Sequence, residues 1–91
     1  MIATTIKREY LEQIKAGTKT IEYRANSAFW QKRVNGKFHS IIMFLCGRKC
    51  NAFRVIKIET IETPDAVKAI IQTPQCFAIH LGGGLIDGQN N

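Results

Sequence analysis

The sequence predicts a single α+β domain whose β-sheet curls around its own core. Segments rich in β-branched and aromatic residues recur along the 91-residue chain and indicate about five strands. Two or three short helices accompany them, one after the first strand and one before the last. The chain is long enough for one core of ordinary size and too short for two. A sheet with so little helix to cover it has to bend over its own apolar side chains.

The first strand and the first helix follow from a change of period near residue 8. Residues 2–6 are mostly β-branched and are bounded by charge, which predicts a short strand. From Arg8 onward the apolar residues recur with the spacing of one helix face, and charged residues fill the other face. We expect Gly17 to end this helix, because glycine readily adopts the left-handed conformation found just past a helix end.

The second strand is predicted at residues 18–24, where apolar and polar residues alternate. We expect Ile21 and Tyr23 to point toward the core, since they are the apolar members of the alternation. The opposite face of the strand would then carry Thr20, Glu22 and Arg24.

The middle of the chain is predicted to contain a short helix and a buried strand. Ser27 is a favourable N-cap for a helical turn that includes Val34. Residues 40–46 are nearly all apolar and indicate a strand that is buried on both faces. A polar loop is expected at residues 47–51.

The strand predicted at residues 52–62 changes its apolar phase. Phe53 and Val55 occupy one set of alternating positions, whereas Ile56 and Ile58 occupy the other. A phase change within one strand indicates a β-bulge, because one extra residue moves all later side chains to the other face.

The last third of the chain predicts a helix, a closing strand and a tail. Thr63 and Pro64 have the pattern of a helix start, and Pro74 would end that helix. Alternation predicts a closing strand at residues 77–81, so the domain is expected to span residues 1–81. Residues 82–91 have little to bury and are expected to form a flexible tail.

The charge is distributed unevenly along the chain. Residues 1–54 carry 11 Lys and Arg against 3 Asp and Glu, a net +8, whereas residues 55–91 carry 2 against 4, a net −2. This asymmetry favours a polyanion as partner, most simply a nucleic acid. The alternative is a solvated basic surface that only aids solubility.

Several other classes of protein are disfavoured. The longest apolar run, residues 41–46, is far shorter than the roughly 20 residues that cross a bilayer. Three cysteines cannot all pair within one chain, and their spacing does not match a structural zinc site. We therefore expect a cytoplasmic protein with no membrane partner, metal or cofactor.

Residues 17–24, Gly-Thr-Lys-Thr-Ile-Glu-Tyr-Arg, match the G-x-K-x-x-E-x-R signature of the ASCH family at all four fixed positions. The strand and helix before this segment, and residues 29–34 after it, also resemble that family. The chain is therefore similar to short, stand-alone ASCH proteins of the bacterial or phage type. The resemblance implies a small PUA-like β-barrel and RNA as the partner.

The signature segment also has the residue types of an RNA contact. Glu22 and Arg24 lie two residues apart on a predicted strand and share a face, and Lys19 lies at the turn before them. Basic side chains can contact phosphates, a carboxylate can accept from a base edge, and an aromatic ring can stack on an unpaired base. The residues expected to contact RNA are Lys19, Thr20, Glu22, Arg24, Trp30, Lys32, Arg33 and Arg54.

A purely structural role is the alternative for the same residues. Glu22 and Arg24 would then pair only with each other and orient a loop. Trp30 would cover the core together with Phe29, and the remaining basic residues would be ordinary surface charges.

The favoured function is a binding module that holds RNA or a nucleoside in a basic cleft, with no catalytic residue. The alternative is a hydrolase, because some similar ASCH proteins hydrolyse N4-acetylcytidine with a lysine, a threonine and a glutamate. Lys19 matches that lysine, but Glu22 stands where the threonine would be. Cleavage of RNA, with Lys19 as electrophile and Glu22 as general base, is a second enzymatic hypothesis. A protein partner is a third possibility, and the sequence leaves the oligomeric state open.

Overall fold

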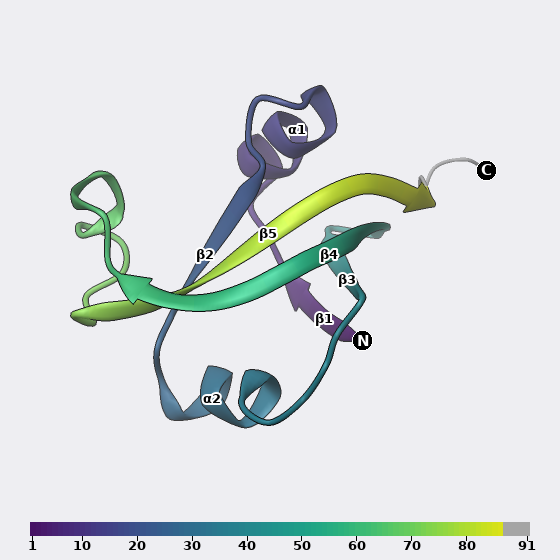
Figure 1. Cartoon of the computed structure of the whole chain (residues 1–91). Coiled ribbons are helices and arrows are strands. Elements are labelled where there is room, and N and C mark those ends of the chain that lie inside the picture. The colour runs from purple at the N-terminus through teal and green to yellow at the C-terminus, as the bar shows by residue number, and fades with distance from the viewer. Residues whose placement is uncertain (87–91) are drawn as a thin grey trace.

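The computed structural model describes residues 1–86, which form five strands in one mixed sheet and two α-helices. Figure 1 shows the long, curved fourth and fifth strands crossing the molecule. The elements in chain order are β1 (Ile2–Thr5), α1 (Arg8–Ala16), β2 (Ile21–Ala25), α2 (Ala28–Val34), β3 (Ile41–Cys46), β4 (Lys49–Glu62), the 3-10 turn η1 (Asp65–Val67) and β5 (Gln75–Ile86). The prediction of a small α+β domain with a curled sheet is confirmed at this level.

The strand order makes β1 and β2 the two edges of the sheet. The order is β1-β3-β4-β5-β2, so the first two strands of the chain lie at opposite ends of the hydrogen-bonded ladder. β1 runs parallel to β3, and every other pairing is antiparallel. Because the sheet curls, its two edges are brought toward each other.

The core fills the inside of the curl. Both helices contribute to it, Leu11 and Ile14 from α1 and Trp30 from α2. Figure 1 places these helices at the top and the bottom of the view, with the sheet between them. The other members of the core cluster come from the strands: Ile2, Ile42, Phe44, Phe53, Val55, Phe77, Ile79 and Leu81.

Two predicted helix boundaries are confirmed. Gly17 follows α1 with a φ of 82°, and its N–H donates to the carbonyl of Ile14 at 3.1 Å. Ser27 caps α2, because its side-chain oxygen accepts from the N–H of Trp30 at 3.3 Å. Both ends therefore use the local chemistry expected from the sequence.

The predicted bulge in β4 is also present, but the strand begins earlier than expected. The register between β4 and β5 shifts at three places between Ala52 and Lys57. The predicted loop at residues 47–51 is in fact a two-residue turn at Gly47 and Arg48, after which Lys49 already pairs with Cys46. Gly47 has a φ of 62°, as tight hairpin turns require, and backbone pairing proceeds beyond it whatever the polarity of the side chains.

The predicted orientation of β2 is wrong. Glu22 pairs with Ile79 and Arg24 with Phe77, and residues directly opposite each other in an antiparallel pair point to the same face. Both partners belong to the core cluster, so Glu22 and Arg24 point inward. Only 5% of the Glu22 surface is exposed. The alternation correctly predicted a strand, but it assigned the two faces of the strand the wrong way round.

The helix predicted between Thr63 and Pro74 is reduced to the short turn η1. Thr63 donates its backbone N–H to the carbonyl of Pro74 at 3.0 Å and its hydroxyl to the carbonyl of Thr73 at 2.6 Å. The two ends of this segment therefore lie side by side, and a straight helix along its length would hold them apart. Ile70 is exposed as a result, whereas Ile71 is buried.

The closing strand is longer than predicted and includes the glycines assigned to the tail. β5 runs from Gln75 to Ile86, and Gly84 pairs with Phe53 on β4. Backbone pairing needs no side chain to bury, which is why a strand continues where the apolar pattern stops. At Gly82 a Cβ atom would lie 3.1 Å from the Cβ of Arg54, so the absence of a side chain lets β5 lie close to Arg54 of β4. The remaining predicted tail, residues 87–91, lies outside the described residues.

Candidate functional site

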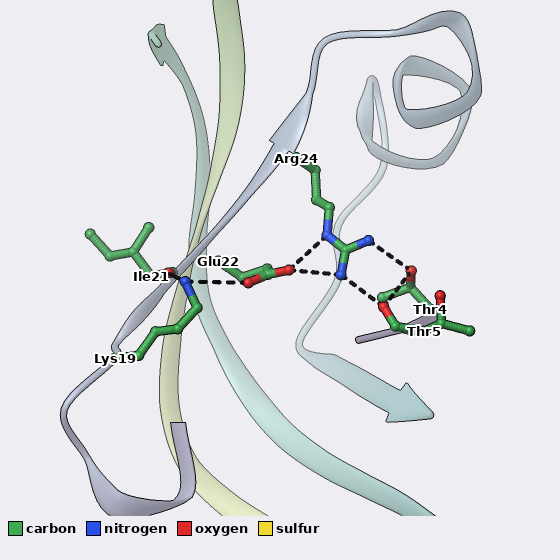
Figure 2. A network of polar contacts seen from close by, with 6 residues as sticks. All are labelled: Thr4, Thr5, Lys19, Ile21, Glu22 and Arg24. Atoms are coloured by element: carbon green, nitrogen blue, oxygen red, sulfur yellow. Dashed lines mark hydrogen bonds and ion pairs between the residues drawn. The ribbon is translucent and has the colours of Figure 1, made fainter. Parts of the chain in front are cut away.

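Lys19, Glu22 and Arg24 form one ionic network around the buried carboxylate of Glu22 (Figure 2). The Arg24 Nε donates to Glu22 Oε2 at 2.8 Å, and the Arg24 Nη2 lies 2.7 Å from the same oxygen. On the other side, the Lys19 Nζ lies 3.4 Å from Glu22 Oε1. A carboxylate placed among core residues is tolerated because cations and hydrogen-bond donors surround it.

Arg24 joins the two edges of the sheet. Its Nη1 donates to the Thr4 hydroxyl at 3.2 Å and its Nη2 to the Thr5 carbonyl at 2.9 Å, both on β1 (Figure 2). The guanidinium carbon also lies 5.2 Å from the centre of the Trp30 ring. All three guanidinium nitrogens are therefore engaged within the protein, and Arg24 bridges the seam, by which we mean the gap between β1 and β2.

Lys19 is held in one position and keeps N–H donors for a ligand. Its Nζ donates to the Ile21 carbonyl at 2.7 Å and approaches Glu22, and it lies 5.6 Å from the Tyr10 ring and 5.7 Å from the Tyr23 ring. An ammonium group has three N–H donors. In residues 1–86 its side-chain hydrogen bond is to Ile21 and its ion pair is with Glu22, so N–H donors remain available to a ligand.

A cavity of about 650 Å³ opens beside this network, and we call it the seam cavity. It lies between the end of β1, the start of α1, strand β2 and the loop that contains η1. This volume is within the roughly 300–1,000 Å³ of typical small-molecule sites. Its lining consists of residues 5–7, Tyr10, Lys19, residues 22–25, Ala66, Val67, Ile70 and Ile71.

The lining is mostly apolar and includes four charged side chains. Lys7, Lys19 and Arg24 are the cations and Glu22 is the only carboxylate, so the lining has a formal charge of +2. Lys7 is exposed, and its Nζ lies 6.0 Å from the Tyr10 ring. An apolar cavity with a few convergent polar groups is the usual form of a ligand site.

Three of the predicted RNA contacts line the seam cavity, namely Lys19, Glu22 and Arg24. Thr20 is exposed and does not line it. Trp30 is only 7% exposed and packs in the core beneath Arg24, so its ring is not presented to a base. This position agrees with the alternative given above, in which Trp30 covers the core.

The other predicted contacts lie away from the cavity lining. Lys32 and Arg33 are exposed on α2, and Arg54 is exposed on β4 beside Gly82. Arg33 covers Phe29, with its guanidinium carbon 3.5 Å from the ring centre, and its Nη1 donates to the Phe29 carbonyl at 3.0 Å. Phe29 is 56% exposed, so the accessible aromatic residue of α2 is Phe29 and not Trp30.

Sequence reasoning missed several lining residues. Alternation predicts Tyr23 in the core, yet Tyr23 and Tyr10 are both only partly buried and flank the Lys19 ammonium. The signal that could have found them is the choice of tyrosine at positions where an aliphatic residue satisfies the same pattern. The residues of the η1 loop gave no comparable signal, because their spacing fits a helix face.

Two kinds of feature are absent from residues 1–86, a metal site and a membrane-spanning helix. Within residues 1–86 no group of three or more His, Cys, Asp or Glu side chains could hold a metal ion. No helix in that part of the chain is long and apolar enough to cross a membrane.

The chain was also compared with family models, with curated proteins and with solved structures, and none of the three comparisons gave a match.

Proposed function

We propose that this chain is a cytoplasmic RNA-binding module of the ASCH type, with a PUA-like fold, that receives one nucleoside of an RNA in the seam cavity. The observation that supports this most directly is the convergence of Lys19, Glu22 and Arg24 on one cavity of about 650 Å³. These are three of the four fixed residues of the signature, and they surround a space of nucleoside-binding size.

The polar side of the cavity offers a donor next to an acceptor. Lys19 keeps N–H donors for a ligand. Among the described residues, Glu22 Oε1 is approached by the Lys19 ammonium at 3.4 Å, whereas Oε2 is occupied by Arg24. Nucleobase edges carry acceptors beside donors, so an adjacent ammonium and carboxylate complement such an edge. The apolar side chains of Val67 and Ile71 would cover the base.

Arg24 has a different role in this proposal from the phosphate contact expected at first. Its nitrogens are committed to Glu22 and to β1, and it stacks near Trp30. Arg24 is therefore a positioning residue that fixes Glu22 and the seam. In this proposal the exposed basic residues, among them Lys32, Arg33 and Arg54, make the salt-dependent contacts to the RNA backbone.

The test is a binding titration with labelled single-stranded RNA and DNA of matched sequence, at low and at near-physiological salt. We expect RNA to bind more tightly than DNA, and Lys19→Gln to weaken RNA binding about tenfold, because a charge-assisted hydrogen bond is lost. Lys37→Gln is the matched control, since Lys37 is exposed and lies outside the cavity lining. It should lower affinity only by the small cost of one remote charge.

The proposal is wrong if neither nucleic acid binds, or if the two lysine variants lose the same affinity. In the first case the basic surface would serve solubility alone. In the second case nucleic acid would bind through surface charge, without a role for the seam cavity.

Hydrolysis of a modified nucleoside is less well supported by the same geometry. Lys19 and Glu22 line the cavity, but the Thr20 hydroxyl does not, and a threonine nucleophile needs a base positioned beside it. Incubation with N4-acetylcytidine, followed by chromatography for released cytidine, distinguishes the two functions. Turnover that disappears in Lys19→Gln would replace binding by hydrolysis as the function of the cavity.

A further inference from the structure

We propose that the seam cavity selects a nucleotide over the corresponding nucleoside, and that Lys7 at its rim is the contact for the phosphate. This inference rests on the proposed function and extends it from the base to the phosphate. Three features of the structure support it: the charge of the lining, the position of Lys7 and the pairing of the other charges.

The charge of the lining is not balanced within the protein. Glu22 is the only carboxylate among the lining residues, and Arg24 and Lys19 both approach it. Lys7 makes no ion pair within residues 1–86, and its contact there is with the Tyr10 ring. The lining therefore keeps a formal charge of +2, which a neutral nucleoside would leave uncompensated.

Lys7 and Lys19 approach the same aromatic ring. Their ammonium nitrogens lie 6.0 Å and 5.6 Å from the centre of the Tyr10 ring. Both cations thus lie in the lining of one cavity and on the same tyrosine. An anion bound there would be attracted by both charges, and this gain is specific to a charged ligand.

The chemistry of lysine suits phosphate in particular. An ammonium group is a compact charge with three donors, and lysine binds phosphate as a point charge without a fixed approach direction. A nucleoside monophosphate carries roughly two negative charges near neutral pH, which matches the excess of the lining. A phosphodiester group of an RNA strand carries one negative charge and would neutralise half of this excess.

The position of Lys7 separates its role from that of Lys19. Lys19 is half-buried, donates to the Ile21 carbonyl and forms an ion pair with Glu22, so it belongs to the inner, polar side of the cavity. Lys7 is exposed and directly precedes α1 at the outer rim. A ligand whose base reaches Lys19 would place its sugar and phosphate toward Lys7.

Isothermal titration calorimetry tests this inference with four nucleosides, their 5′- and 3′-monophosphates, and inorganic phosphate alone. For the wild type we expect at least one monophosphate to bind about tenfold more tightly than its nucleoside, as a charge-assisted contact to phosphate supplies. Lys7→Gln should reduce this ratio to about twofold or less, because the nucleotide loses its phosphate contact. Lys37→Gln should retain the wild-type ratio.

Three results would overturn the inference. Wild-type protein that binds a nucleoside and its monophosphates equally has no phosphate contact. A Lys7→Gln variant that keeps the wild-type ratio, including one that loses nucleoside and nucleotide affinity alike, shows that Lys7 does not contact the phosphate. Inorganic phosphate that binds as tightly as any nucleotide would mark an anion site without selectivity for a nucleotide. Absence of binding by every nucleoside, every nucleotide and RNA would instead contradict the proposed function itself.

Discussion

At the scale of the residue, Glu22 determines how its neighbours are arranged. It lies opposite Ile79 on the core side of the sheet, and its two oxygens hold Lys19 on one side and Arg24 on the other. A buried carboxylate is stable only when it is paired and hydrogen-bonded. Lys19 and Arg24 are thus needed for Glu22 to fold inward, and Glu22 in turn fixes the ammonium that faces the cavity.

Replacement of this carboxylate should be costly. Glu22→Ala leaves the half-buried Arg24 and Lys19 without their shared counter-ion, and we expect the free energy of unfolding to fall by about 3 kcal/mol. Urea denaturation followed by circular dichroism measures this change.

The matched control is Asp65→Asn, which removes an exposed carboxylate paired with Lys68 at 2.9 Å. Exposed ion pairs contribute little, so this variant should unfold at the wild-type urea concentration. Equal effects of the two substitutions would mean that the ionic network contributes no more than a surface pair.

At the scale of the element, helix ends that depend on neighbouring backbone atoms were predictable from the sequence. The shape of a segment that depends on contacts between distant residues was not. The end of α1 at Gly17 and the cap at Ser27 depend on neighbouring backbone atoms, and both were predicted correctly. The helix expected after Thr63 was wrong, although its apolar spacing was sound. Hydrogen bonds from Thr63 to Thr73 and Pro74 draw the ends of that segment together, and no local pattern reveals them.

The cap of α2 offers a test at this scale. Ser27→Ala removes the acceptor for the Trp30 N–H, and we expect a loss of about 1 kcal/mol in the free energy of unfolding. Ser27→Asp keeps an acceptor and should remain close to the wild type in the same urea titration. The cap would have no energetic role if the aspartate variant lost as much stability as the alanine variant.

At the scale of the whole molecule, side chains join the two edges of the sheet in the part of the chain that the structure describes. Backbone hydrogen bonds run from β1 through β3, β4 and β5 to β2, and Arg24 spans the remaining seam to Thr4 and Thr5. The part of the site that could be predicted, Lys19, Glu22 and Arg24, lies in one short segment. Tyr10, the end of β1 and the η1 loop could not be assigned to it, because only the curl of the sheet brings such distant segments together.

Hydrogen exchange should distinguish the strands that are joined by backbone hydrogen bonds from the seam, which the Arg24 side chain joins. Arg24→Lys keeps the charge but loses the forked contacts to β1, so we expect amide exchange to accelerate in β1 and β2 while β4 and the centre of β5 keep their protection. Mass spectrometry of peptides from these strands reads the effect. Arg33→Lys, on the exposed face of α2, is the control, and unchanged exchange in β1 of Arg24→Lys would show that the seam is held by other contacts.

The pairing of β2 also determines when the site comes into existence during synthesis. The signature segment leaves the ribosome early, but the backbone partner of β2 in the described structure is β5, more than fifty residues later. Until β5 has emerged, Glu22 has no core to face and the seam has only one of its strands in place. A nascent chain therefore carries the signature long before it has a cavity, and ligand binding becomes possible only when translation of the domain is nearly finished.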